Sequence, residues 1–151
     1  MRKRVRRKHY ALINPIAHAI AGASITDQES LDKLRLVELA ALDAMTRGQG
    51  GVEEWRTLVD MMNVSEVMGI SGIGPEVLPH VEIAQAELHR AAKRYEETKK
   101  MGLSGVGIKA LREIHEYHDL QRTSICRAEY ERMIDKTRNR IRSGAAEVVH
   151  V

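Results

Sequence analysis

The sequence predicts an all-α fold, a single bundle of about five helices that follows a basic N-terminal arm. Apolar residues recur at helical spacing through most of the 151 residues, and no segment alternates apolar and polar residues as a half-buried strand does. Glycine-containing stretches interrupt these periodic segments where helices would end. Because a chain of this length can bury one substantial core, we expect a basic arm over residues 1–9 and one all-α domain over residues 10–151.

The first clear helix is predicted over about residues 26–47. Thr26 and Glu29 have the spacing of a capping box, and Gly48 follows the last turn. The apolar stripe expected to face the core consists of Leu31, Leu34, Val37, Ala41, Leu42 and Met45. A short additional helix over residues 15–21 is expected upstream of it.

Two further helices are predicted, one over about residues 52–68 and one from near Pro75 or Pro79 to about residue 100. Gly69 would end the first of them. Proline suits the start of the second, because the first turn of a helix has no intrahelical N–H bonds to lose. The expected buried positions are Trp55, Leu58, Val59, Met62 and Val67 in the first helix and Val81, Ala84, Leu88, Ala91 and Tyr95 in the second.

The last two predicted helices cover about residues 108–121 and 124–143. Ser124 is a favourable N-cap residue for the final helix, and Gly144 follows its last turn. The apolar side is expected to contain Ile108, Leu111, Ile114 and His118 in the first of these helices and Ala128, Ile134 and Ile141 in the second.

Positive charge is concentrated in the arm, where six of the first nine residues are basic and none is acidic. The remainder of the chain has 18 basic and 21 acidic residues, so the formal net charge of +3 belongs to the arm. Such an arm is expected to dock on nucleic acid, on an acidic partner or on residues 10–100 of the protein itself, a segment in which acidic residues outnumber basic ones. The candidate binding residues are Arg2, Lys3, Arg4, Arg6, Arg7 and Lys8.

A second basic surface is expected on the last predicted helix, where six basic residues outnumber three acidic ones. One interpretation is a helix laid along a phosphate backbone, and the other is an ordinary solvated face with ion pairs one turn apart. The candidate nucleic-acid-binding residues here are Lys136, Arg138, Arg140 and Arg142.

Two inter-helix segments, residues 70–78 and 103–111, share the pattern apolar-Ser-Gly-apolar-Gly-x-x-x-Leu. Each resembles the hairpin of helix-hairpin-helix DNA-binding domains, and the resemblance covers only these turns. It implies that Gly105 and Gly107 let the backbone approach a phosphate that Lys109 also contacts. The alternative is a pair of glycine helix ends, each followed by a new helix start.

The sequence argues against catalysis. His115 and His118 lie one turn apart, as metal ligands can, but no third ligand accompanies them, and the alternative is a pair on the helix surface or partly buried. Cys126 has no assignable acid–base partner, so a small packing residue is expected there. No nucleotide-binding fingerprint occurs. We therefore expect a non-enzymatic protein with no catalytic residue, no metal site and no cofactor.

A cytoplasmic location is expected, because a single cysteine cannot form an internal disulfide. The apolar run over residues 10–23 has the approximate layout of a signal peptide, but Asn14, Pro15 and His18 interrupt it. No other segment approaches the roughly 20 apolar residues that a membrane span requires, so no membrane association is expected.

Residues 10–18, 61–64 and 118–122 carry a resemblance that extends over most of the chain. In these segments the protein resembles small helical proteins of unassigned function that are encoded by phages and prophages of proteobacteria and begin with a similar basic arm. The resemblance implies an accessory product, either a DNA-associated regulator or an inhibitor that sequesters a host or defence protein. Its motifs are not chemical ones, so it assigns no functional residue.

The expected function is therefore nucleic-acid binding through the basic arm. Stacking on single-stranded bases is not expected, because the chain has no Phe, one Trp and four Tyr. The alternative is a protein-binding inhibitor of a host or defence protein, or a homo-oligomeric module such as a homodimer. In that alternative Met61, Met62 and Met68 would form an adaptable contact surface, unless these methionines fill the core.

Overall fold

The computed structural model describes residues 27–144, and this part of the chain is all-α, as predicted. Its elements are α2 (Gln28–Thr46), α3 (Val52–Ile70), the 3-10 helix η1 (Pro75–Val77), α4 (Leu78–Thr98), α5 (Gly105–Ser124) and α6 (Arg127–Arg142). The predicted short helix over residues 15–21 and the arm over residues 1–9 lie outside the described residues.

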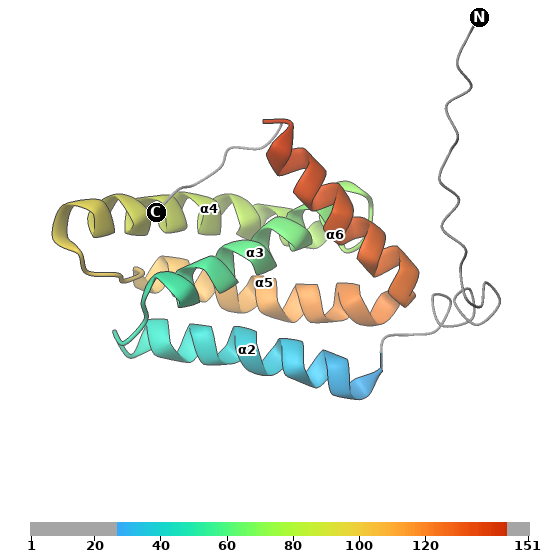
Figure 1. Ribbon diagram of the computed structural model, residues 1–151, viewed down its shortest axis with the longest axis horizontal. Helices are drawn as coiled ribbons and strands as arrows, with labels where there is room; N and C mark the ends of the chain where they lie inside the picture. The colour runs from blue at the N-terminus through green and yellow to red at the C-terminus, as the bar shows by residue number, and fades with distance from the viewer. Residues whose placement is uncertain (1–26, 145–151) are drawn as a thin grey trace, which may run out of the picture.

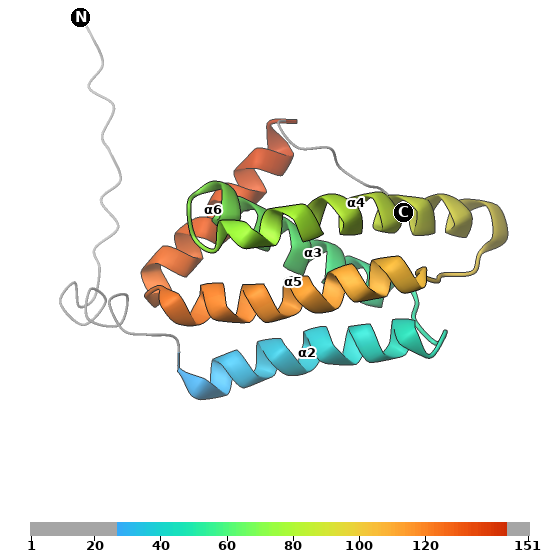
Figure 2. The same ribbon diagram turned by 180° about the vertical axis from the view of Figure 1, so that it is seen from behind.

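Helices α2, α5 and α4 lie side by side in that order, and α3 crosses one face of this layer (Figures 1 and 2). α3 contacts each of the other four α-helices, so it is the centre of the bundle. α6 packs chiefly against α3 and runs obliquely to the other helices (Figure 1).

The core is aliphatic and sulfur-rich, and Trp55 is anchored in it by an Nε1–H that donates to the Leu88 carbonyl at 3.1 Å. Met61, Met62 and Met68 are buried at 3%, 2% and 0% exposure. The interpretation of these methionines as a contact surface is therefore wrong, and they fill the core.

Two positions in the predicted stripe of α2 are not covered. Leu34 is 36% exposed and Val37 is 57% exposed, whereas Leu31, Leu42 and Met45 are buried. The reason is the placement of α6, which lies on α3 and leaves the neighbouring side of α2 open. The helical period of α2 was predicted correctly, but the width of its buried face was not.

The start of α2 differs from the prediction. Asp27 is the N-cap residue, and its Oδ1 accepts from the Ser30 backbone N–H at 2.7 Å. The predicted box paired Glu29 with Thr26, which lies outside the described residues. A comparable contact occurs at the start of α3, where the Glu54 carboxylate accepts from the Gly51 N–H at 2.8 Å.

Gly69 does not end α3, which continues to Ile70. A Cβ at Gly69 would lie 3.0 Å from the side chains of Val77 and Leu78, so this glycine allows η1 and the start of α4 to pack closely against α3. The chain turns only at Gly72 and Gly74, whose φ values of 88° and 59° are left-handed and suit glycine.

The boundaries of the last two helices also shift. α5 begins at Gly105, three residues before the predicted start, because the Ser104 hydroxyl caps it by accepting from the Gly107 N–H at 3.0 Å. α5 then continues through Ser124, the residue predicted to cap the next helix. α6 follows from Cys126, whose side chain makes no capping hydrogen bond.

Candidate functional site

A group of buried charges lies between α2 and α5, where Arg122 of α5 meets Glu38 of α2. Arg122 is only 1% exposed. Its guanidinium donates two parallel hydrogen bonds to the Glu38 carboxylate, with N–O distances of 2.7 and 3.0 Å. Because such a bidentate pair fixes both distance and orientation, it sets the position of α5 along α2.

Three further side chains complete what we term the α2–α5 ion-pair cluster. His115 Nδ1 lies 3.0 Å from Glu38 Oε2. Asp119 Oδ1 accepts from Arg35 Nε at 2.7 Å and from Arg122 Nη2 at 3.3 Å. Burial alone would raise the pKa values of Glu38 and Asp119, but the hydrogen bonds from their partners hold both pKa values below the usual range. Both carboxylates are therefore ionised at neutral pH.

Gln121 connects α5 to α3 and to the loop that follows α3. Its Nε2 donates to the carbonyls of Ile73 at 2.7 Å and Ser65 at 3.2 Å, which fixes the orientation of the amide. Its Oε1 accepts from the Ser65 hydroxyl at 3.0 Å and faces His118 Nδ1 at 3.1 Å. Since Oε1 can only accept, His118 Nδ1 carries the proton. Burial lowers the pKa of His118 to about 4, so its ring is neutral at pH 7.

The two histidines that were considered as metal ligands serve different partners. Both rings are buried; His115 contacts Glu38, and His118 contacts Gln121. Over residues 27–144, no group of three or more His, Cys, Asp or Glu side chains is arranged to hold a metal ion. The arrangement supports a structural role for both rings. Cys126 is half-buried at the start of α6.

Sequence reasoning missed the ion-pair cluster, although a signal for it was present. Glu38 lies four residues after Leu34 and four before Leu42, so it occupies a position of the apolar stripe. Arg122 likewise lies one turn after His118 on the inner side of α5. A charged residue at a core position of each of two helices is the pattern that predicts a buried ion pair.

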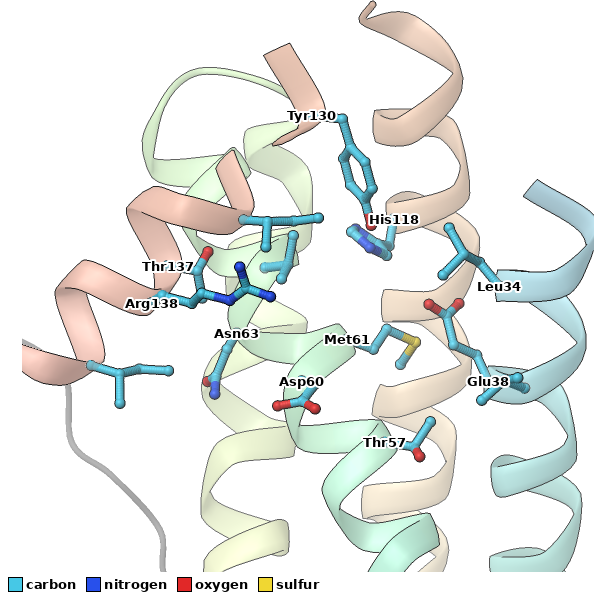
Figure 3. Close-up of a pocket in the computed structure, with 14 residues that line it drawn as sticks. Leu34, Glu38, Thr57, Asp60, Met61, Asn63, His118, Tyr130, Thr137 and Arg138 are labelled. Atoms are coloured by element: carbon cyan, nitrogen blue, oxygen red, sulfur yellow. The ribbon is translucent and has the colours of Figure 1, made fainter. Parts of the chain in front are cut away.

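A groove of about 410 Å³ separates α2 from α6, with α3 as its floor (Figure 3). We term it the α2–α6 groove. Its lining is mainly apolar, and Asp60, Asn63 and Arg138 lie at the α3 and α6 sides of it. Tyr130 and His118 approach each other at its inner end, with ring centroids 6.2 Å apart (Figure 3). The apolar lining residues are Leu34, Val37, Met61, Val64, Ile134 and Ile141.

Residues 136–142, the last two turns of α6, include four basic residues and no acid. Lys136, Arg138 and Arg142 are exposed, and Arg140 is partly buried. Lys136 Nζ donates to Ser71 Oγ at 2.8 Å, and Arg140 Nη2 lies 3.4 Å from Glu66 Oε1. Arg138 forms a long ion pair within α6, in which its Nη1 lies 3.5 Å from Asp135 Oδ1.

Beside this basic stretch lies a second hollow of about 540 Å³, termed the α3–α6 notch. On the α6 side it is lined by Lys136, Asn139, Arg140 and Ser143, and on the α3 side by Val67 and Ile70. The lining surface is mainly apolar, and both cations that border the notch also contact α3, Lys136 through Ser71 Oγ and Arg140 through Glu66 Oε1. Cations at an open surface suit an anionic oxygen such as that of a phosphate.

Lys109, Gly105 and Gly107 lie at the N-terminal end of α5, which is the end remote from α6 (Figure 1). The structure does not join them to the basic stretch of α6. The buried Glu87 carboxylate accepts from the Ser104 hydroxyl, so an anion already occupies this helix start. A Cβ at Gly107 would lie 2.8 Å from Glu87 Cβ, which gives this glycine a packing role.

The two glycine segments that share a sequence pattern have different backbones. Gly72 and Gly74 adopt left-handed conformations in a turn, whereas Gly105 and Gly107 form the first turn of α5. The segments are therefore not a structural repeat. The remaining candidates, Arg2, Lys3, Arg4, Arg6, Arg7 and Lys8, lie outside the described residues.

Comparison with known proteins gives no identification: no protein-family model, curated protein or solved structure matches the chain. Among the helices of residues 27–144, none is both long enough and apolar enough to span a membrane.

Proposed function

We propose that this protein is a non-enzymatic nucleic-acid-binding protein that holds a phosphate backbone with its basic arm and with the C-terminal half of α6. The observation that supports this most is the acid-free run from Lys136 to Arg142 beside the α3–α6 notch. Residues 27–126 carry 12 basic and 17 acidic residues, so this surface differs in sign from the rest of the described chain. DNA is the preferred ligand, as expected of a DNA-associated regulator.

The N-terminal end of α5 is not part of the proposed phosphate-binding surface. A phosphate there would meet the Glu87 carboxylate, which is already bonded to Ser104 and paired with Arg90. The positive charges proposed to bind phosphate are those of the arm and of α6. Lys109 is exposed but remote from both α6 and the notch, so it is expected to contribute little.

The test is binding of a labelled DNA duplex and a matching RNA by fluorescence anisotropy across a salt series. Each lost phosphate contact lowers the slope of log K against log salt by roughly 0.9 for duplex DNA. The triple substitution K136A/R138A/R142A should therefore reduce the slope by roughly 2–3. Replacing the six basic arm residues by Ala should reduce it further.

A matched control removes the same charge elsewhere. Lys93, Arg94 and Lys100 are exposed, form no ion pair in the described structure and lie toward the C-terminal end of α4, away from α6 (Figure 1). The K93A/R94A/K100A variant should keep most of the salt slope. Equal losses in the two triple variants would show that only net charge matters, which would refute the assignment of a binding face.

A second candidate function is favoured by an exposed apolar surface on α2. Leu36 is 70% exposed and Leu39 is 49% exposed, and these side chains lie one turn apart. We propose a protein-binding role, as an inhibitor of a host or defence protein or as a homo-oligomeric module, as the alternative. Light scattering of the wild-type protein and of the L36S/L39S variant tests the homo-oligomeric version. If that version is right, the particle mass in solution is higher for the wild-type protein than for the variant.

A further inference from the structure

The α2–α6 groove leaves apolar side chains of α2 and α6 partly uncovered. Val37 of α2 is more than half exposed, and Ile134 and Ile141 of α6 face the same space. Several apolar side chains gather in this one groove, whereas the apolar residues on an ordinary protein surface are scattered singly. A surface of this shape is expected to have an occupant.

The position of the groove relative to the start of the described chain restricts what that occupant can be. α2 and α6 begin at the same end of the molecule (Figures 1 and 2). Leu34 lies two turns from the start of α2, which is about 10 Å along the helix. Four residues, 23–26, can extend over roughly 13 Å, so the segment before them can reach the groove.

That segment, residues 10–22, has the composition of a groove-filling element. It contains no Asp, Glu, Lys or Arg. Asn14 followed by Pro15 is the pattern of an N-cap and a first helical residue, and Gly22 suits the position after the last turn. Ile16 and Ile20 are four residues apart, so a helix over residues 15–21 would present both on one face.

We infer that residues 10–22 of this same chain dock in the α2–α6 groove, with Ile16 and Ile20 against Val37 and Ile134. The docked segment braces α6 against α2, two helices that the described residues leave apart along the groove. It also determines where the basic arm leaves the body of the protein.

A charge at the groove supports this occupant. Asp60 of α3 lines the groove and has no ion-pair partner among residues 27–144. Neighbouring atoms partly remove water from this carboxylate and raise its pKa. In this proposal Arg7 and Lys8, the basic residues nearest to the docking segment, pair with Asp60, and Arg2, Lys3, Arg4 and Arg6 remain for a phosphate backbone.

The test is a pair of engineered cysteines in the full-length chain. Cys126→Ser first removes the only natural cysteine. Ile16→Cys is then combined with Val37→Cys, and Ile20→Cys with Ile134→Cys. Under mild oxidation the docked segment should give a disulfide within one chain, seen as a mass loss of two hydrogens in a monomer. Ile16→Cys combined with Leu120→Cys is the control, because Leu120 is exposed on α5 and does not line the groove.

A second measurement avoids dependence on disulfide geometry. Maleimide labelling of Ile134→Cys should become about tenfold faster when Ile16→Asp and Ile20→Asp are added, because undocking removes the burial of two isoleucines. Labelling of Leu120→Cys should stay constant. Circular dichroism reports whether each variant is folded.

Three outcomes would overturn the inference. Disulfides that form only between two chains would assign the groove to a second copy. Equal labelling rates with and without the aspartates, together with no disulfide in either groove pair, would show an open groove that a different protein fills. A control disulfide as abundant as the groove disulfides would show an undocked segment.

Discussion

The α2–α5 interface and the exposed side chains of α6 use the same kinds of charged residue with opposite consequences. Arg122 is enclosed and bonded to Glu38 in a bidentate geometry, whereas Arg138 is exposed and only loosely paired with Asp135. A buried pair is costly to break, because the remaining charge has neither water nor a partner. An exposed pair contributes little to stability. Buried charge here positions helices, and exposed charge is available to a partner.

The largest expected effect is that of Arg122→Met. The substitution keeps much of the side-chain volume but leaves the Glu38 carboxylate buried without its strongest partner. We expect the free energy of unfolding to fall by about 3–5 kcal/mol. Urea denaturation followed by circular dichroism measures it. The control, Arg138→Met, should change stability by less than about 0.5 kcal/mol.

Removing both charges sharpens the same comparison. In E38L/R122M no unpaired charge of this pair remains, so most of the stability lost in Arg122→Met should return. If the double variant is as unstable as the single one, the pair itself stabilises the fold and the loss cannot be assigned to a stranded carboxylate.

The pH dependence of stability gives the next effect. His118 binds a proton at a pKa of about 6.5 in the unfolded chain and at about 4 in the folded protein. The unfolded state therefore binds more protons between these values, and stability falls as the pH is lowered from about 6.5 to 4. The loss should reach roughly 2–3 kcal/mol. His118→Asn keeps a donor for Gln121 and should flatten this part of the profile.

A smaller effect is expected at the start of α5. In Gly107→Ala the new Cβ would meet the Cβ of the buried Glu87 at 2.8 Å, so the substitution should cost about 1–3 kcal/mol. Gly105→Ala meets nothing within 4 Å and should be neutral or slightly stabilising. Thermal unfolding of the two variants separates them. A loss of DNA affinity in Gly105→Ala with unchanged stability would instead support the hairpin interpretation of this segment.

The smallest effect on stability is expected for Lys136→Ala. Among the described residues its Nζ hydrogen-bonds only to Ser71 Oγ, so the free energy of unfolding should change by less than about 0.5 kcal/mol. In the proposed function the same substitution should lower the salt slope of DNA binding by roughly 0.9. A large loss of stability would place Lys136 among the structural charges.

The sequence allowed the helices to be predicted because their apolar periods are long and glycine separates them. Boundaries were less predictable, since Asp27 and Ser104 cap helices whose starts were placed one to three residues away. Pairing between helices could not be predicted, because periodicity shows which face is apolar and not which helix covers it. The openness of the α2–α6 groove and the partner of Glu38 both depend on that pairing.

The candidate surface on α6 was predicted from composition, but the notch beside it was not. Ile70 and Val67 of α3 meet Lys136 and Arg140 only because α6 turns back across α3 after Cys126. The phosphate-binding interpretation of Gly105 and Gly107 did not anticipate Glu87, which lies on another helix and approaches this turn through the fold.

The chief support of α6 is a single helix, α3, and this has a consequence for hydrogen exchange. Helices α4 and α5 bury apolar residues against each other and against α3, so their amide protons should exchange only through large-scale opening. Amide protons of α6 should exchange through a smaller, local opening. A ligand that contacts α6 would then slow exchange in that helix more than elsewhere, so the location of slowed exchange would map its binding face residue by residue.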